Sequence, residues 1–288
     1  MLASLAIAFP AIDPVALEIG PLQIRWYALA YIVGIVLGWL YCRALAKRPD
    51  SRATTQAVDD LVFWATLGVL IGGRLGLVLF YQPSYFFAHP LDIVKVWQGG
   101  MSFHGGFLGV LAALFYTARR HKLRFFDLSD LAAAAAPIGI FLGRLANFVN
   151  GELWGRPTDG DWGMVFPDPA AGGIPRHPSQ LYQAFAEGLA VFVVLRILIQ
   201  IGWLGRAGRV SAAFALSYGL ARFFDEFWRQ PDSYLGYYWG FLTQGQLLSL
   251  PMILIGLYFL WRLRGPAPAA AEPPPAGQRE RREPDRPS

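Results

Sequence analysis

The sequence predicts an all-α polytopic membrane protein with seven transmembrane helices. Of its 288 residues 55% are hydrophobic and only 16% are charged, whereas a soluble domain carries about 25% charged residues. Seven apolar runs each approach the ~20 residues that a helix needs to cross the hydrocarbon core. They lack period-two alternation, which excludes a closed barrel. The predicted spans are 27–46, 60–81, 101–118, 128–149, 178–201, 209–228 and 243–263.

The basic residues predict the orientation of these spans, because loops rich in Lys and Arg stay in the cytoplasm. The loops after spans one, three and five and the end of span seven hold twelve Lys and Arg residues, against five in the opposite connections. We therefore expect the N-terminus outside and the C-terminus in the cytoplasm. The net charge of +5 is then a topology signal, and binding to nucleic acid is not needed to explain it.

One membrane-embedded domain is expected over residues 1–264, followed by a tail. Residues 1–9 are apolar but lack a basic n-region, so we interpret them as an outer interfacial segment. The connection of about 25 residues near 150–177 is long for a loop and predicts a small outer head between helices four and five. Residues 265–288 are rich in Pro, Ala and charge, which predicts a disordered cytoplasmic tail. The single Cys42 is expected to be an apolar filler.

The densest group of polar residues ends span four. Arg144 lies about one turn below the outer surface, and Asn147 shares its face at i+3. An ionisable side chain at this depth costs ~2.5–3.5 kcal/mol on insertion scales and usually marks a functional site. An arginine fork beside an amide suits a phosphate or a carboxylate. The alternative is that Arg144 pairs with a neighbouring acid and only holds the helices together.

Span six places Tyr218, Arg222 and Glu226 on one stripe, because they recur every fourth residue. Arg222 and Glu226 can form an i,i+4 ion pair, so a structural role is a serious alternative. Asp225 and Arg229 add further charge at the same end. That excess favours a site for an anionic ligand.

Span three opens with His104, Gly105 and Gly106 at the outer face. A helix start offers free N–H groups and a positive dipole end to an anion, and the glycines remove bulk beside the imidazole ring. A histidine with satisfied hydrogen bonds is the alternative. The sequence has no second His, Cys or Asp set at metal spacing, so no metal site is expected.

Three further features have two interpretations each. Tyr27 is either a site residue or part of the aromatic belt. The run 177–182 opens span five and either lines the site or anchors the interface. Arg74, beside Gly72, Gly73 and Gly76, is either functional or part of close helix packing.

These residues together resemble the prolipoprotein diacylglyceryl transferase family over roughly residues 22–264. Several long motifs coincide in order, which makes the resemblance specific, and Ala146 stands where many relatives have Gly. The motifs are Arg25-Trp26-Tyr27, His104-Gly105-Gly106, Gly143-Arg144 with Asn147-Phe148 and Asn150-Gly151-Glu152, His177-Pro178-Ser179-Gln180-Leu181-Tyr182, and Arg222 with Glu226-Phe227, Arg229 and Pro231-Asp232.

The resemblance implies a bacterial inner-membrane enzyme whose active site faces the periplasmic leaflet. It would transfer the sn-1,2-diacylglyceryl group from phosphatidylglycerol to the lipobox cysteine of a prolipoprotein, releasing glycerol 1-phosphate, as the first step of lipoprotein maturation. Its implied partners are phosphatidylglycerol, the lipobox peptide and membrane lipids. The implied reaction needs no metal, nucleotide or redox cofactor.

The resemblance also implies roles for individual residues. His104 is the candidate base for the thiol, with Glu226 or Glu152 as alternatives. Arg144 and Arg222 would bind the phosphate. The residues expected to contact the lipid or the peptide are Tyr27, Gly105, Gly106, Asn147, Glu152, Gly155 and Tyr218.

Two other classes fit the sequence less well. An outward-facing transporter or binding protein for an anionic solute would also place arginines in a helical bundle, but a transport path needs polar residues in both halves. Here the cytoplasmic halves are nearly uniformly apolar. An intramembrane serine protease would need a Ser–His pair, and Ser102 lies too close to His104 in sequence for good geometry.

Overall fold

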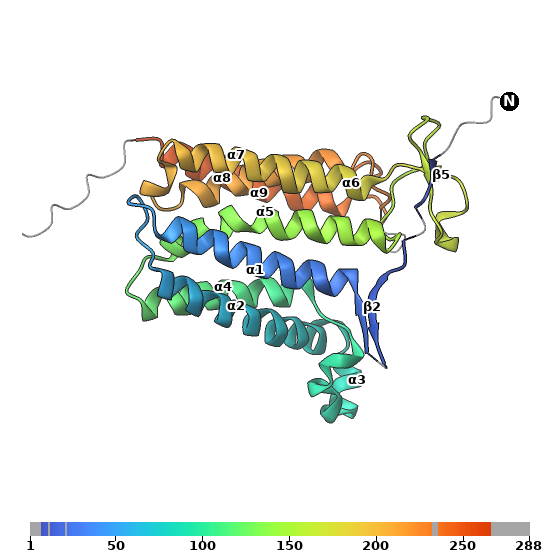
Figure 1. Cartoon of the computed structure of the whole chain (residues 1–288), viewed down its shortest axis with the longest axis horizontal. Coiled ribbons are helices and arrows are strands. Elements are labelled where there is room, and N and C mark those ends of the chain that lie inside the picture. The colour runs from blue at the N-terminus through green and yellow to red at the C-terminus, as the bar shows by residue number, and fades with distance from the viewer. Residues whose placement is uncertain (1–6, 11, 21, 232–235, 266–288) are drawn as a thin grey trace, which may run out of the picture.

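Long helices lie side by side along the long axis of the computed structural model, which describes residues 7–10, 12–20, 22–231 and 236–265 (Figure 1). Each predicted span coincides with a long helical stretch. These are α1 (Trp26–Ala46), α2 (Thr55–Gly76) with the π-helix η1 (Leu77–Tyr81), α4 (Phe103–Arg120), α5 (Phe125–Val149), the helix Ser179–Gln200, α8 (Arg209–Asp225) and α9 (Gln244–Arg262).

Five of the described helices are long and apolar enough to cross a membrane. They are α1, α2 with η1, α5, Ser179–Gln200 and α9. The polytopic, all-helical class is therefore confirmed. The crossing of α4 and α8, and with it the count of seven spans, stays a prediction.

Helix starts follow from capping residues that the sequence supplies. Thr54 caps α2 by accepting a hydrogen bond from the Ala57 N–H, and Ser102 caps α4 by accepting from the Gly105 N–H. Thr243 and Gln246 form a reciprocal capping box at the start of α9. These caps fix where α4 and α9 begin, and both beginnings face the candidate site described below.

The helix Ser179–Gln200 is not regular. It consists of α6 (Ser179–Gln183), the π-helix η5 (Ala184–Ala190) and α7 (Val191–Gln200). α5 is the central helix, because it contacts α1, α4, α8, η5 and α7.

Most of the short elements gather at one end of the helices (Figure 1), whereas η6 (Trp203–Gly205) connects α7 to α8 at the other end. A hairpin of β2 (Val15–Ile19) and β3 (Leu22–Arg25) leads into α1, and a small sheet has the strand order β1-β4-β5. The remaining short elements are β1 (Ile7–Ala8), β4 (Met164–Val165), β5 (Pro175–Arg176), α3 (Pro83–Ala88), and the 3-10 turns η2 (Pro90–Val94), η3 (Val96–Gln98) and η4 (Pro169–Ala171).

The two chain ends fall partly outside the described residues. Residues 1–6 of the expected interfacial segment and residues 266–288 of the expected tail are not described. The described part of the N-terminal segment, Ile7–Ala8, pairs in parallel with β4 of the predicted head. The segment therefore ends as a strand in the head, which its apolar composition did not predict.

A glycine contact joins α2 to α4. A Cβ added at Gly105 would meet the backbone oxygen of Gly72, and one added at Gly109 would meet that of Gly68. Small residues at such positions let two helix backbones approach closely, as is common between membrane helices. We call Gly68, Gly72, Gly105 and Gly109 the glycine contact.

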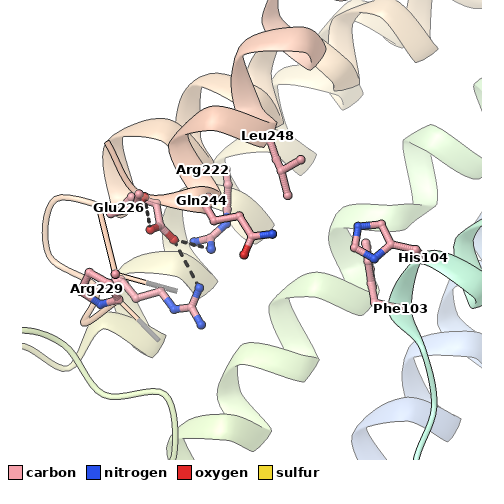
Figure 2. A pocket seen from close by; sticks show the side chains of 11 residues that line it. Phe103, His104, Arg222, Glu226, Arg229, Gln244 and Leu248 are labelled. Atoms are coloured by element: carbon pink, nitrogen blue, oxygen red, sulfur yellow. Dashed lines mark hydrogen bonds and ion pairs between the residues drawn. The ribbon is translucent and has the colours of Figure 1, made fainter. Parts of the chain in front are cut away.

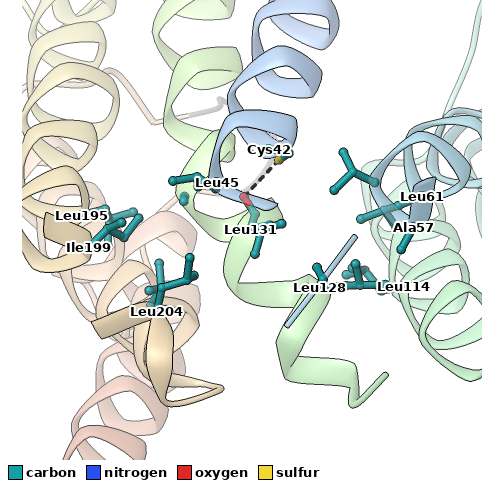
Figure 3. Packing of buried hydrophobic residues seen from close by; sticks show 14 of the residues in the cluster. Cys42, Leu45, Ala57, Leu61, Leu114, Leu128, Leu131, Leu195, Ile199 and Leu204 are labelled. Carbon is teal, nitrogen blue, oxygen red and sulfur yellow. Dashed lines mark hydrogen bonds between the residues drawn. The ribbon is translucent and has the colours of Figure 1, made fainter. Parts of the chain in front are cut away.

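Buried apolar side chains form a cluster (Figure 3). The cluster lies at the end of the helices opposite the head, and we call this the core end. They come from the last turns of α1, α4 and α7 and the first turns of α2, α5 and α8. Cys42 belongs to this core, and its thiol donates a hydrogen bond to the Leu131 carbonyl oxygen at 3.3 Å. The expected filler role of Cys42 is therefore confirmed.

Candidate active site

A groove of about 200 Å³ with charged side chains in its lining opens between the start of α4 and the facing ends of α8 and α9 (Figure 2). His104 lies on one side, and Arg222, Glu226 and Arg229 lie across the groove from it. Among the described residues, the lining consists of Phe103, His104, Arg222, Glu226, Arg229, Pro231, Gly236, Thr243, Gln244, Gly245 and Leu248. The structure thus brings three of the four predicted catalytic residues to one cavity.

Glu226 is 2% exposed and both its carboxylate oxygens accept hydrogen bonds. Oε1 accepts from Arg222 Nη2 and from Arg229 Nη1, the latter at 3.3 Å, and Oε2 accepts from Thr243 Oγ1 at 2.6 Å. Gly245 leaves the space for this carboxylate, because a Cβ there would overlap it. The i,i+4 ion pair that the sequence offered as a structural alternative is present, and it lines the groove.

A second carboxylate connects the predicted arginines. Arg144 donates to Glu187 Oε2 from Nη2 at 2.9 Å and from Nε at 3.3 Å, and Arg222 Nη1 lies 3.4 Å from Glu187 Oε1. Glu187 is fully buried, in η5. The chain Arg144–Glu187–Arg222–Glu226 therefore links α5, η5 and α8 at the groove.

Glu187 was missed at the sequence level. It lies inside the apolar run of span five, whereas most of the predicted site residues lie at the ends of spans. The available signal was the lone carboxylate at membrane depth, which usually has a partner and a function.

The end of α5 forms an adjoining polar group. Asn147 Nδ2 donates to Glu152 Oε1 at 2.8 Å, and Asn150 Nδ2 donates to the same oxygen at 3.2 Å. Gly151, at φ 68°, turns the chain so that Glu152 folds back onto the helix. Tyr27 lies near enough for the charges of Arg144 and Glu152 to act on it, and its hydroxyl is 3.2 Å from that of Tyr31.

Tyr218 and the predicted glycines have close protein neighbours. The Tyr218 ring stacks on Phe214 with centroids 5.4 Å apart, within reach of the charge on Glu187. Gly105 belongs to the glycine contact, and Gly106 faces Val69. A Cβ on Gly155 would lie 2.6 Å from the backbone oxygens of His177 and Trp228. Contact of any of these residues with a substrate stays a prediction.

Arg74 has a packing role. It is 6% exposed and donates to backbone carbonyl oxygens of the connection between α3 and α4. Nε reaches Ile93 at 2.8 Å, Nη1 reaches Gly99 at 2.8 Å, and Nη2 reaches Asp92 at 2.5 Å. The guanidinium therefore holds this connection against the end of α2.

Residues 177–182 connect the head to the helix Ser179–Gln200 and hydrogen-bond to the first residues of the head. Gln180 Nε2 donates to the Glu152 carbonyl oxygen at 2.6 Å, and Ser179 Oγ donates to that of Leu153 at 3.1 Å. His177 Nδ1 lies 3.3 Å from Tyr182 Oη, and partial burial lowers the pKa of this histidine. Among the described residues, no three His, Cys, Asp or Glu side chains are grouped to hold a metal ion.

Helices long and apolar enough to cross a membrane, with a groove lined by histidine, arginine and glutamate at one end, define a polytopic membrane protein with a charged groove. The family model described as prolipoprotein diacylglyceryl transferase matches residues 14–262, and the chain belongs to this family. It is therefore a transferase of lipoprotein biosynthesis.

Curated relatives agree over nearly their whole length. A protein of Rhodopseudomonas palustris is 51% identical over 278 residues, which cover 93% of this chain and 96% of the relative. One of Paramagnetospirillum magneticum is 54% identical over 268 residues, covering 92% and 99%. One of Rhodospirillum centenum is 52% identical over 278 residues, covering 92% and 98%. Each is named phosphatidylglycerol–prolipoprotein diacylglyceryl transferase.

Proposed function

We propose that the chain transfers the sn-1,2-diacylglyceryl group from phosphatidylglycerol to the lipobox cysteine of a prolipoprotein, and that the groove is its active site. Family membership supports the reaction. The observation that supports the site is that Arg222 and Glu226 face His104 across one cavity, while Glu187 joins Arg144 to Arg222. Such a transfer is the first step of lipoprotein maturation.

The reaction exchanges one bond for another. The cysteine sulfur attacks the glyceryl carbon that is esterified to the phosphate, a C–S thioether bond forms, and the C–O bond to the phosphate breaks. The phosphate oxygen keeps the electron pair, so glycerol 1-phosphate leaves, and the thiol proton passes to a base. Negative charge therefore accumulates on the phosphate in the transition state.

Arg144 and Arg222 are proposed to bind that phosphate. Preorganised cations facing developing charge are usually the largest electrostatic contribution to catalysis. Nη1 of Arg144 makes no hydrogen bond to any residue that the structure describes, so this donor is available to a ligand. Asn147 and Glu152 at the end of α5, with Tyr27, Tyr218, Gly105, Gly106 and Gly155, are proposed to shape the substrate site.

His104 is proposed as the base. Its side chain is exposed on the groove and faces the arginines. A thiol with a free pKa of about 8.5 needs such help near neutral pH. The other two candidates have engaged carboxylates: Glu226 accepts from Arg222, Arg229 and Thr243, and Glu152 accepts from Asn147 and Asn150.

The proposed setting is a bacterial inner membrane crossed seven times by residues 1–264. The distribution of Lys and Arg supports a periplasmic N-terminus and head, at 150–177, and a cytoplasmic C-terminus. The groove and the head lie at the same end of the helices, at the ends of α5 and α8 and the starts of α4 and α9. Phosphatidylglycerol of the outer leaflet and the lipobox peptide would both reach that end.

In vitro transfer tests this function. Purified protein is mixed with phosphatidylglycerol and a lipobox peptide, and mass spectrometry follows the peptide. We expect a diacylglyceryl increment on the cysteine and release of glycerol phosphate. A peptide with serine in place of that cysteine serves as control. Folded protein that binds the lipid but forms no thioether would contradict the proposal and favour an anion transporter.

A further inference from the structure

We propose that Glu187 is a positioning residue of the active site. Its buried carboxylate holds the guanidinium groups of Arg144 and Arg222 together and so fixes the spacing of the two cations that bind the phosphate. The inference rests on the proposed function, in which those arginines bind the phosphate. Glu187 itself acts through them and contacts no reacting atom.

Glu187 is placed for this role by its two oxygens. Oε2 accepts from Arg144, in α5, and Oε1 accepts from Arg222, in α8. Glu226 pairs with Arg222 and Arg229 but not with Arg144. Within the described part of the chain, Glu187 is thus the carboxylate that joins the two proposed phosphate-binding arginines across helices.

The backbone around Glu187 is specialised. η5 is a π-helix, a rare form that often occurs at functional sites. Gly188 follows Glu187 and lies against α5, since a Cβ there would be 2.7 Å from Phe141 Cβ. Arg144 is one turn further along α5 from Phe141. Close contact of η5 with α5 therefore brings the Glu187 carboxylate within reach of Arg144.

The charges around Glu187 suit one phosphodiester. With Glu226 and Arg229, which continue the same chain of ion pairs, three guanidinium groups and two carboxylates sum to a single positive charge. The phosphate of phosphatidylglycerol carries a single negative charge. Without the Glu187 carboxylate, two cations in a mostly buried space would repel each other and separate. A displacement of about 1 Å at a catalytic group can cost 10²-fold in rate.

The test uses the full chain in detergent or nanodiscs. Glu187→Gln keeps the shape of the side chain and removes its charge, while Glu187→Asp keeps the charge and shortens the reach. Asp130→Asn is the matched control, because Asp130 is a carboxylate at 1% exposure that lies at the core end of α5. Transfer rates give kcat and KM for phosphatidylglycerol, and thermal unfolding gives stability.

We expect Glu187→Gln to lower kcat/KM about 10²-fold, with partial recovery in Glu187→Asp. Asp130→Asn should lower the unfolding temperature while its folded fraction keeps the wild-type kcat. In an Arg144→Lys background, Glu187→Gln should lower kcat/KM by a smaller factor than it does in the wild type, because both changes act on the same ion pair.

Three results would overturn the inference. One is a wild-type kcat/KM in Glu187→Gln. Another is a Glu187→Gln variant that unfolds at the same temperature as Asp130→Asn and loses no more kcat/KM than that control does. If Glu187→Gln does not fold, a wild-type rate in Glu187→Asp is the third. A wild-type protein that forms no thioether would instead contradict the proposed function, so the two failures are distinguishable.

Discussion

Three buried carboxylates at the two ends of the helical bundle differ in their hydrogen-bond partners: Asp130 at the core end, and Glu187 and Glu226 at the groove end. At the core end, Asp130 accepts from the N–H groups of Gly208 and Ser211 at 2.7 and 2.8 Å and from Ser211 Oγ at 2.6 Å. At the groove end, Glu187 and Glu226 accept mainly from guanidinium groups. Neutral donors at the start of α8 make Asp130 a cap that holds α5 to α8. Cations around Glu187 and Glu226 keep positive charge concentrated for an anion.

The apolar contacts follow the same division. Fully buried Leu131, Leu195 and Ile199 lie at the core end, whereas the groove end is lined by polar and aromatic side chains. We therefore expect stability to depend mainly on one end and catalysis on the other. The first three predictions below would each break this division if they failed, and the fourth tests the glycine contact.

The largest effect is expected from Arg144→Ala. Removing an arginine that binds the phosphate should reduce transfer by at least about 10²–10³-fold, the usual cost of losing one preorganised donor. Membrane insertion and thermal unfolding should change little. Arg144→Lys keeps the positive charge but loses the paired N–H donors of the guanidinium group, so it should recover only part of the transfer rate. Normal activity of Arg144→Ala would contradict the phosphate role.

The second largest effect is expected from His104→Gln. Loss of a general base costs about 10²–10⁴-fold, measured as kcat with saturating phosphatidylglycerol. His121→Gln is the matched control, because its imidazole Nε2 lies 2.8 Å from Asp60 at the core end. The control should keep the wild-type rate. A near-normal rate for His104→Gln would transfer the base role to an acid or to water.

Leu131→Ala tests the core end. A large-to-small change at a buried position typically destabilises by about 2–5 kcal/mol, and Leu131 is 1% exposed. Thermal or denaturant unfolding should show the loss, while the folded fraction keeps its kcat. A catalytic defect without a loss of stability would show that the two ends are coupled.

The smallest effect is expected from single glycine changes. Gly109→Ala should destabilise by about 1–3 kcal/mol, the usual cost of overpacking, because the new Cβ would meet the Gly68 backbone. Gly139→Ala is the control, since its Cβ would meet nothing within 4 Å. In a helix this control should be neutral or stabilising by up to about 1 kcal/mol. Equal unfolding temperatures for the two variants would contradict the glycine contact.

The sequence predicted the helices well because their signal is local. An apolar run of about 20 residues needs no knowledge of its neighbours to be recognised, and each run became a long helix. The grouping of His104, Arg222 and Glu226 was also predictable, because costly polar residues at the same ends of several spans must meet at one face. Their roles in the reaction came from the resemblance and stay proposals.

The hydrogen-bond and ion-pair partners of the polar side chains could not be predicted from the sequence, because they depend on which helices lie next to each other. The sequence allowed Arg144 either to bind an anion or to pair with a neighbouring acid. Its partner in the structure, Glu187, lies 43 residues further along the chain. The carbonyl partners of Arg74 lie up to 26 residues away in an irregular connection that has no periodic signal. The strands β1, β4 and β5 contain two residues each, too few for alternation to show.

The glycine contact has a consequence for the width of the groove. Backbones that touch at Gly68–Gly109 and Gly72–Gly105 leave α4 little freedom to slide or rotate against α2. His104 precedes Gly105 directly, so its position relative to α2 is set by main-chain atoms with few rotatable bonds between them. The wall of the groove that holds the proposed base is thus rigid. We therefore expect any opening that admits a lipid to come from movement of α8 and α9 on the other side.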